Sequence, residues 1–565
     1  MKCLYIHNRR SWGPKESSWL TFHYISEELE RRGHLLAKYS VDFNLTDDNN
    51  NHITDTIWQQ TDCLFTVFGE AHGPLKIAEA RDIPSFLEIN YACGEIVNPF
   101  MEKEASRLKI NKDELVYEYP GAGKNTYDRT TYVVGAGNIN YTEKTYREFG
   151  SNRVKMFTAG VDHEHFKPDF SARGKGKIRF TVTAASLAFR KGIIHICRAW
   201  RALPREYHHK IELHCFGKEP FGTDSAKEFR DLLKDFSNVI HHGFHSNQSV
   251  EYVREHAISD VMLCPTLAEG QSATALEGMS FGLYSIVSPY TGSDFEKIPS
   301  TILSHEPEKW VEEISSAICT IVDNYDEIKK TFPIIREHAQ TNYRWDKFAK
   351  DFVDFMEIVW QDYYQGKHWR EIRGDTTLRI NYPIDKNSIV IDCGGFHGEW
   401  TEKLKEKYDP YIYLFEPVPQ FVETLKAQFA KDAKVHIIEA AVGNKDGEEI
   451  LFMSPVKSAW NSTTSTPSPG WNEVRVQVIN FASWIKQQNI KEIDLLKLNI
   501  EGAEYDVLEH LLSVGLIDKI CHIQIQFHRF PMGAEQRRDT IRRALSRTHK
   551  NTYNYDFVWE SWSRK

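Results

Sequence analysis

The sequence lacks three features that would place the protein in a well-marked class. No segment approaches the roughly 18 consecutive apolar residues that a membrane-spanning helix needs. Positive charge is not in excess, because 70 Lys and Arg stand against 79 Asp and Glu. None of the nine cysteines forms a C-x-x-C pair, and their number is odd. We therefore predict reduced thiols, a cytoplasmic location and no nucleic-acid partner, while peripheral contact with a membrane stays open.

Short apolar strands alternate with amphipathic helical stretches along most of the chain, which predicts parallel sheets built from β-α-β units. The N-terminal run 1–7 is too short and polar for a signal peptide and is predicted as a first strand. The apolar spacing in residues 345–364 predicts a helix with one buried face. We expect the following organisation: β-α-β domains in residues 1–168 and 169–364, a charged linker in residues 365–386 and a third β-α-β domain in residues 387–565.

The clearest functional signal in the first half is a pair of glutamates separated by seven residues. Glu269 and Glu277 follow the apolar strand Val261–Pro265 and lead into a helix. The N-terminus of a helix offers unpaired N–H groups that suit a diphosphate. Glu269 would face the ligand, and Glu277 could accept hydrogen bonds from ribose hydroxyls. The simpler interpretation, that two glutamates meet by chance near a helix start, stays open.

Two cations and several glycines stand at the ends of other predicted strands. Arg190 and Lys191 lie between a strand and the next helix, where they could meet a departing diphosphate, although a solvated basic pair is the alternative. Gly217 and Gly243 end strands and permit either close approach of a ligand or a sharp turn.

In this order, the residues resemble family 4 of the glycosyltransferases, which have the GT-B fold of two Rossmann-like domains. The matching pieces are Gly160-Val-Asp162, Arg190-Lys-Gly192, Phe216-Gly217, Gly243, the run Glu269–Glu277, Phe281-Gly282 and Thr291-Gly292-Ser293. The resemblance implies a retaining, metal-independent hexosyltransferase whose second domain holds a nucleotide-diphosphate sugar. It implies that Arg190, Lys191 and Glu269 are catalytic, and that the donor is bound by Gly217, Gly270, Gln271, Ser272 and Glu277.

The sequence departs from that family at several positions. Ser186 stands where many relatives have an arginine, and Glu88-Ile-Asn90 stands where a histidine often follows the strand. Glu88 and Asn90 could line the acceptor cleft or be structural, and His72 is a further candidate. The pairs His208-His209 and His241-His242 show no partner spacing for a metal, so we expect packing or surface roles and no metal.

A second cofactor signal opens the third region. The strand Ser388–Ile391 runs into Asp392-Cys-Gly394-Gly395-Phe-His-Gly398, and a second strand ends at Glu416. Such a glycine turn admits a cofactor close to the backbone, and an acid at the second strand's end suits the two hydroxyls of an adenosine ribose. The glycines do not follow G-x-G-x-x-G, which favours S-adenosylmethionine over NAD.

Together with Ala441-Val-Gly443, Lys497-Leu-Asn499-Ile-Glu501-Gly-Ala-Glu504 and Ile523–His528, this region resembles the FkbM family of O-methyltransferases. The resemblance implies a Rossmann-like class I methyltransferase domain. It places the methyl donor against Asp392, Gly394, Gly395, Gly398, Glu416 and Glu501. It also puts Lys497 and Asn499, as catalytic residues, at the mouth of the site, where the hydroxyl must be oriented. His528 is the candidate base, because its ordinary pKa lies near neutrality, although a structural histidine is the alternative.

Two positions depart from the FkbM pattern. Asn499 and Gln526 stand where relatives usually carry acids, which argues against a bound metal or a carboxylate mechanism at those two positions. The polar loop Ser458–Ser465 is a candidate for sugar contact or a simple flexible loop.

The sequence therefore predicts a bifunctional enzyme of polysaccharide biosynthesis. One half would add a sugar to a glycan or lipid-linked saccharide, and the other would methylate a sugar hydroxyl, with the fusion favouring successive steps. Two alternatives stay open. The first half could be an inactive GT-B module that binds glycan for the methyltransferase, or the methyl acceptor could be a secondary metabolite or lipid.

Overall fold

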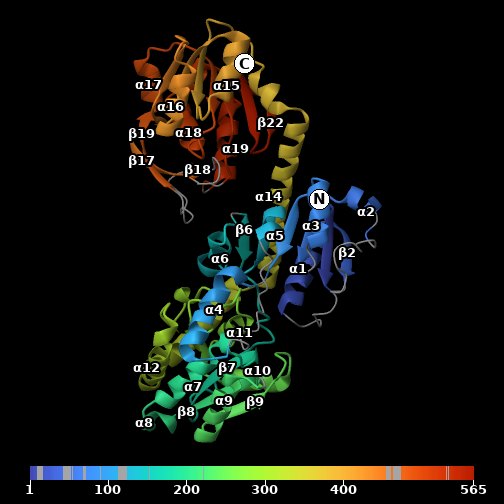
Figure 1. The fold of residues 1–565 in the computed structure, drawn as a ribbon, viewed down its shortest axis with the longest axis vertical. Helices are drawn as coiled ribbons and strands as arrows, with labels where there is room; N and C mark the ends of the chain where they lie inside the picture. Colours follow the sequence, from blue (N-terminus) through green and yellow to red (C-terminus); the bar gives the residue numbers. More distant parts are fainter. Residues whose placement is uncertain are drawn as a thin grey trace. The chain divides into compact units, whose positions relative to one another are not determined.

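The computed structural model of the protein is an α/β structure with three large sheets (Figure 1). By contacts within the chain it divides into two compact units, Met1–Trp360 and Gln361–Lys565. The structure describes residues 1–8, 17–41, 53, 55–67, 72–89, 91–111, 124–151, 153–219, 222–453, 460–461, 472–529, 531 and 533–565.

The first unit contains two six-stranded parallel sheets. The first has the order β2-β1-β3-β4-β5-β6 and the second the order β12-β11-β10-β7-β8-β9. In each sheet the strand order reverses beside the first strand, which is where open α/β sheets form ligand crevices. The strands are β1 Cys3–Asn8, β2 Leu35–Val41, β3 Cys63–Val67, β4 Ser85–Glu88, β5 Tyr132–Ala136, β6 Val154–Phe157, β7 Ile178–Ser186, β8 Ile211–Lys218, β9 Val239–Gly243, β10 Val261–Cys264, β11 Tyr284–Val287 and β12 Ser300–Ile302.

Alternating side chains of these strands pack into separate cores on the two faces of each sheet. In β10, Val261 and Leu263 join one core, whereas Met262 and Cys264 join another. Helices cover both faces, as the apolar character of the strands requires. The helices are α1 Ser17–Arg31, α2 Asp55–Gln60, α3 His72–Ala80, α4 Gly94–Leu108, α5 Lys124–Arg129, α6 Lys144–Glu148, α7 Ile193–Ala202, α8 Arg205–His208, α9 Asp224–Asp235, α10 Val250–Ala257, α11 Ala273–Ser280, α12 Trp310–Asp323 and α13 Tyr325–Asn342.

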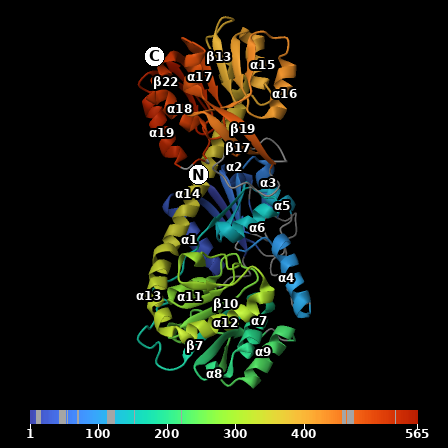
Figure 2. The same cartoon turned by 90° about the vertical axis from the view of Figure 1, so that its left-hand side faces the viewer.

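Helix α14, Trp345–Glu371, crosses back from the second sheet to the first. Phe352 is fully buried, and its ring lies 5.4 Å from that of Phe65 in β3. Trp345 stacks on Tyr24 of α1, which lies beside α14 (Figure 2). Burying each such side chain contributes roughly 1.5–3 kcal/mol, so this face holds the two sheet domains together.

The predicted linker in residues 365–386 begins as the last turns of α14 rather than as a linker. Trp369 is 4% exposed and packs against Tyr553 and Tyr555, which explains why the helix continues to Glu371 despite its charge. Two 3-10 turns follow, at Gly374–Thr376 and Leu378–Ile380. The exact domain boundaries stay a prediction.

The second unit has a seven-stranded sheet of order β15-β14-β13-β20-β21-β23-β22 and a four-stranded sheet of order β16-β19-β17-β18. The sequence does not predict the second of these sheets, nor the antiparallel pairing of β23 with its neighbours. The elements are β13 Ile389–Cys393, α15 Glu399–Tyr408, β14 Tyr411–Phe415, α16 Pro419–Gln428, β15 Val435–Ile438, β16 Ala441–Gly443, β17 Gly447–Met453, β18 Trp460–Asn461, β19 Asn472–Asn480, α17 Phe481–Gln487, β20 Ile493–Leu498, α18 Glu504–Ser513, β21 Ile520–Ile525, α19 Ala534–Leu545, β22 His549–Tyr555 and β23 Trp559–Arg564.

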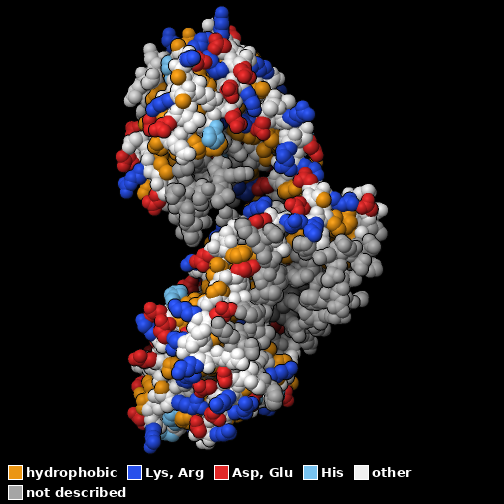
Figure 3. All heavy atoms as spheres, viewed as in Figure 1, with side chains coloured by type: hydrophobic (Ala, Val, Ile, Leu, Met, Phe, Trp, Pro, Cys, Tyr) orange, Lys and Arg blue, Asp and Glu red, His pale blue; other side chains and the backbone are white. Residues whose placement is uncertain are grey.

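Among the residues that the structure describes, no helix has both the length and the apolar character needed to cross a membrane. On the face drawn in Figure 3, side chains of Lys and Arg are interspersed with those of Asp and Glu.

Candidate functional sites

Glu269 and the two cations predicted to accompany it meet in the second sheet domain. Arg190 and Lys191 lie in a 3-10 turn after β7, and Glu269 lies in the loop between β10 and α11. Arg190 Nη1 donates to Glu269 Oε1 at 2.8 Å, and Lys191 Nζ donates to the same oxygen. The side chains of Arg190 and Lys191 are 17% and 19% exposed, so the cluster is shielded from water but not sealed.

The electrostatics of this cluster suit an anionic ligand. Burial alone raises the pKa of Glu269, but the charges of Arg190 and Lys191 outweigh it, and the pKa lies below its ordinary value. Two cations share one carboxylate, which leaves one positive charge in surplus. A diphosphate at this place would find charge-assisted donors already gathered.

The residues that follow Glu269 are held by the protein itself. Thr142 donates to the carbonyl oxygen of Gly270 at 2.5 Å, and the backbone N–H of Ala159 donates to Gln271 Oε1 at 2.7 Å. Ser272 caps α11 by accepting from Ala275 N. Thr142 and Ala159 belong to the first sheet domain, so these bonds join that domain to the loop at Glu269.

Glu277 lies inside α11 and is 5% exposed. Asn247 Nδ2 donates to its Oε1 at 2.8 Å, and the Tyr252 hydroxyl donates to its Oε2. Burial raises the pKa of Glu277. The sequence does not single out Asn247 or Tyr252, because neither belongs to a motif. A ribose bound at Glu277 would share the carboxylate with both of them.

Of the other candidate residues in the first unit, some lie at the edge of the second sheet, one is buried, and two have side chains outside the described part of the structure. Gly217 lies in β8 and Ser186 ends β7, so both stand near the carboxyl edge of the second sheet. Glu88 is 3% exposed at the end of β4 and accepts from Thr21 at 2.8 Å, which is a buried structural arrangement. Asn90 and the side chain of His72 lie outside the described residues.

One histidine of the two pairs, His242, has two possible metal ligands beside it. Among the described residues, His214, His242 and Glu255 place one ligand atom each within 4.8 Å of one another. Yet His214 Nδ1 lies 3.0 Å from His242 Nε2, which is hydrogen-bond distance, and Glu255 pairs with Arg179 at 3.2 Å and with Arg254. Both arginines oppose a further cation, so no metal is assigned to this group.

The second unit contains a cavity of about 400 Å³ at the carboxyl ends of β13, β14 and β20. Its volume lies within the range of small-molecule sites. Among the predicted residues, the lining includes Gly394, Glu416, Asn499 and Glu501. The loop Ser458–Ser465 lies outside the described residues, apart from the backbone of β18.

Glu416 stands at the end of β14 and is 5% exposed. Its Oε2 accepts from Phe396 N at 2.8 Å and its Oε1 from Val418 N at 3.0 Å. Burial raises the pKa of Glu416 despite these two bonds. Each carboxylate oxygen keeps a further lone pair, so two hydroxyls could still bind. Phe396 has φ 48°, a left-handed conformation that its bond to Glu416 stabilises.

Asp392 and Lys497 lie beneath the cavity rather than in its wall. They are 1% and 3% exposed, and Lys497 Nζ donates to Asp392 Oδ1 at 2.7 Å and to the Gly394 carbonyl at 2.6 Å. Thr401, not anticipated from the sequence, donates to the other oxygen of Asp392 at 2.8 Å. The pair therefore fixes the glycine turn, and its predicted role toward the ligand stays a prediction.

Protein atoms leave no room for a side chain at two glycines of the turn. Gly394 has φ 93°, and a Cβ there would lie 2.0 Å from the carbonyl oxygen of Asn499. A Cβ at Gly395 would lie 2.2 Å from Leu414. Gly398 caps α15. Only Gly394 of the three lines the cavity.

The last predicted group follows β20 and β21. Asn499 lines the cavity, and its buried Oδ1 has no hydrogen-bond partner among the described residues. Glu501 also lines it, whereas His528 is not part of the lining and lies behind Glu501, 3.4 Å from its Oε2. Glu504, quoted in the sequence motif without a role, accepts from His528 Nδ1 at 3.0 Å.

Comparisons with known proteins match one segment in each of the two units. Residues 179–324 match the family model of glycosyl transferases group 1, and residues 392–555 match that of the methyltransferase FkbM domain. An uncharacterized glycosyltransferase of Methanocaldococcus jannaschii is 25% identical over 258 residues, 44% of this chain and 63% of that relative. Methyltransferase 1 of Beauveria bassiana is 28% identical over 154 residues, 23% of this chain and 60% of that relative.

The chain thus spans about three fifths of the length of the curated relatives it matches. A solved structure, Anabaena Alr3699/HepE in complex with UDP, is similar at 13% identity and a TM-score of 0.47, covering 63% of this chain and 100% of that one. The predicted α/β fold class and both family resemblances are confirmed. The protein carries a glycosyl transferases group 1 domain followed by a methyltransferase FkbM domain.

Proposed function

We propose that the protein transfers a sugar from a nucleotide-diphosphate sugar to a glycan acceptor and O-methylates a sugar hydroxyl with S-adenosylmethionine as donor. The observation that carries the proposal is the cavity at the ends of β13, β14 and β20, with Glu416 and Glu501 in its wall. The lining carries four carboxylates, including Glu449 and Asp506, against the two cations Lys445 and Arg537, and this excess of negative charge suits a donor that bears positive charge and a ribose.

In the first unit, Arg190 and Lys191 are the residues that would stabilise charge on a departing diphosphate. Both already point at one oxygen, Glu269 Oε1, so their positions are fixed before a ligand arrives. Glu269 would hold sugar hydroxyls, and Glu277 the ribose. Transfer with retention and without a metal is the outcome that the family resemblance supports.

In the second unit, the described residues fit S-adenosylmethionine. Glu416 would accept hydrogen bonds from the ribose hydroxyls, and Gly394 would allow the ligand to approach the backbone. Asn499 Oδ1 is a buried acceptor without a hydrogen-bond donor among the described residues, so a donor group of the ligand could bind it. When bound, S-adenosylmethionine supplies an electrophilic methyl group on a sulfonium sulfur. Asn499 and Glu501 would orient the acceptor hydroxyl toward it.

The test gives the full-length protein labelled S-adenosylmethionine and a panel of UDP-, GDP- and dTDP-sugars with saccharide acceptors. Mass spectrometry of the products should show one added sugar and one added methyl group. Absence of both additions across the panel, with no binding of either donor, would contradict the proposal. A labelled methyl group on a lipid or a non-saccharide metabolite would replace the sugar acceptor by that class.

One observation favours a second candidate, a first unit that binds glycan without catalysis. The cations at the site are already neutralised in part by Glu269, and Ser186 adds no third cation. The variants Glu269→Ala and Lys191→Ala distinguish the two functions. Loss of sugar transfer with intact methylation supports the glycosyltransferase, whereas unchanged modification of the glycan by both variants supports the binding module.

A further inference from the structure

Glu501, His528 and Glu504 form a continuous line of titratable groups that runs from the cavity wall into the protein. Glu501 follows β20, Glu504 begins α18, and His528 lies three residues after β21. His528 Nε2 lies 3.4 Å from Glu501 Oε2, and His528 Nδ1 lies 3.0 Å from Glu504 Oε1. A histidine held between two carboxylates can accept a proton and release it again.

Glu501 is the member of this line that faces the cavity. Its side chain is 33% exposed, against 15% for His528 and 0% for Glu504. Glu501 has φ 49°, a backbone conformation that is costly for a residue with a Cβ and that points to a functional constraint. The residue with this conformation is also one that lines the cavity.

Glu504 fixes the histidine in one tautomer. Its Oε2 accepts from Gly502 N at 2.9 Å, and its Oε1 accepts from His528 N at 2.8 Å as well as from His528 Nδ1. Because Oε1 already accepts from the backbone N–H of His528, it is placed to accept from Nδ1 of the same residue as well, which assigns the proton to Nδ1. The lone pair of Nε2 therefore faces Glu501.

We propose that Glu501 takes the proton of the acceptor hydroxyl during methyl transfer and passes it to His528, which Glu504 holds in place. The hydroxyl oxygen forms a bond to the methyl carbon, and the carbon–sulfur bond breaks with its electron pair left on the sulfur of the sulfonium donor. The proton moves from the hydroxyl to Glu501 and on to His528 Nε2. The resulting imidazolium lies between two carboxylates. This inference rests on the proposed methyl transfer.

The charges around the histidine support this direction of proton flow. Burial lowers the pKa of His528, but Glu504 and Glu501 outweigh it, and the pKa lies above its ordinary value. Burial raises the pKa of Glu501. The adjacent Arg529 turns away to Asp362 and Glu535. A proton taken by Glu501 thus finds a stronger acceptor directly behind it.

The first experiment measures the His528 pKa by NMR in the full-length protein without donor. We expect wild type to titrate above ordinary histidine, and both Glu504→Gln and Glu501→Gln to titrate lower. His510→Asn, a change to another histidine on α18, should leave the His528 pKa unchanged. A His528 pKa that is the same in wild type and in both glutamine variants would contradict the proposed proton transfer from Glu501 to His528.

The second experiment follows methyl transfer against pH in single turnovers. Glu501→Gln should slow transfer by about 100-fold or more while the donor still binds. Because the working base must have lost its proton, the wild-type rate should fall as pH drops through the raised His528 pKa, and Glu504→Gln should move that fall to lower pH. Glu423→Gln, an exposed glutamate on α16, is the matched control.

The outcomes separate this inference from the proposed function. A wild-type protein that binds no methyl donor and methylates no acceptor contradicts the proposed function. If Glu501→Gln methylates the acceptor as fast as wild type across the pH range, the proposed proton transfer through Glu501 and His528 is wrong, while the proposed function stands. Glu501 lies in the cavity wall, so its variant keeps the inference testable if the buried Glu504→Gln fails to fold.

Discussion

The two candidate sites hold their charges in opposite ways. In the first unit, Arg190 and Lys191 stand in the site and are paired with Glu269 before any ligand arrives. In the second unit, the cavity wall carries Glu416 and Glu501, and neither forms an ion pair with Lys or Arg among the described contacts. A ligand of the first site must exchange ion pairs, whereas a ligand of the second meets groups held by backbone N–H donors or by histidine.

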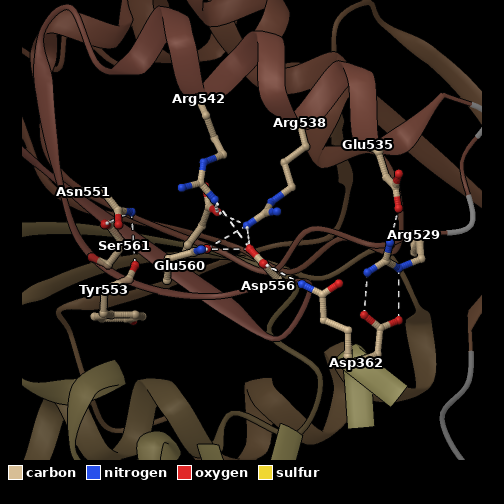
Figure 4. Close-up of polar contacts among 12 residues, drawn as sticks. Asp362, Arg529, Glu535, Arg538, Arg542, Asn551, Tyr553, Asp556, Glu560 and Ser561 are labelled. Carbon is tan, nitrogen blue, oxygen red and sulfur yellow. Dashed lines mark hydrogen bonds and ion pairs between the residues drawn. The ribbon is translucent and has the colours of Figure 1, made fainter. Parts of the chain in front are cut away.

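Apart from the pair of Arg537 with Asp506 in the cavity lining, the second unit has a network of ion pairs that involves no lining residue. Figure 4 shows Arg538 and Arg542 reaching from α19 to Glu560 and Asp556, and Arg529 lying between Asp362 and Glu535. Arg529 Nη2 and Nε bond the two oxygens of Asp362 at 2.5 and 3.0 Å, which anchors the last part of α14 to this unit. The comparison therefore predicts that cations matter for chemistry in the first unit and for stability in the second.

The largest expected effect tests the structural half of that statement. Arg538 is 7% exposed and donates to Glu560 at 2.7 Å, to Asp556 at 2.8 Å and to Asn554 at 2.7 Å. Arg538→Met leaves the 2% exposed Glu560 with fewer partners and should cost the second unit about 3–5 kcal/mol. Hydrogen exchange of the β21–β23 amides measures the loss.

Arg543→Met, on the exposed side of the same helix, is the control and should change exchange little. Affinity for the methyl donor should be the same in both folded variants, because neither arginine lines the cavity. An equal effect of the two variants on exchange would mean that the buried network contributes no more than a surface arginine.

The next effect tests the chemical half. Lys191→Ala removes one of the two cations at Glu269, and loss of a preorganised charge of this kind costs about 10²–10³-fold in rate. Sugar transfer should fall by that factor, while methyl transfer and the unfolding midpoint stay close to wild type. Donor consumption in stopped assays measures the first, and Lys234→Ala, 74% exposed, is the control. Unchanged sugar transfer in Lys191→Ala would contradict the statement that cations matter for chemistry in the first unit.

The parts of the structure that the sequence predicts are those with a local pattern. The strands from β7 to β11, the helix after Trp345 and the meeting of Arg190, Lys191 and Glu269 all follow from short apolar runs and from the parallel order of β-α-β units. In a parallel sheet, the carboxyl ends of strands share one edge, so residues after each strand are brought together without knowledge of the packing.

The parts that it does not predict depend on which atom faces which neighbour. Asp392 and Lys497 have the spacing of ligand contacts, yet each satisfies the other beneath the cavity. His528 has the chemistry of a base, yet Glu501 stands between it and the cavity. The signal for Glu504 was present in the same motif, but spacing along the chain does not show that a residue five positions after Asn499 reaches a histidine that follows another strand.

The smallest expected effect concerns Glu416, where the second site has an acceptor without a countercharge. Glu416→Gln replaces one oxygen by an NH₂ group, so either Phe396 N or Val418 N loses its acceptor and a ribose hydroxyl loses a charged one. Since a hydrogen bond to a charged group is worth about 1.5–3 kcal/mol, affinity for S-adenosylmethionine should fall by about 10–100-fold. Calorimetry with the full-length protein measures it, and Glu399→Gln on the exposed side of α15 is the control. If Glu416→Gln lowers the rate of methyl transfer but not the donor affinity, the Glu416 carboxylate shapes the turn at Phe396 without touching the ribose. The contrast between the ion-paired Glu269 of the first site and the carboxylates without Lys or Arg partners in the second would then apply to Glu501 alone.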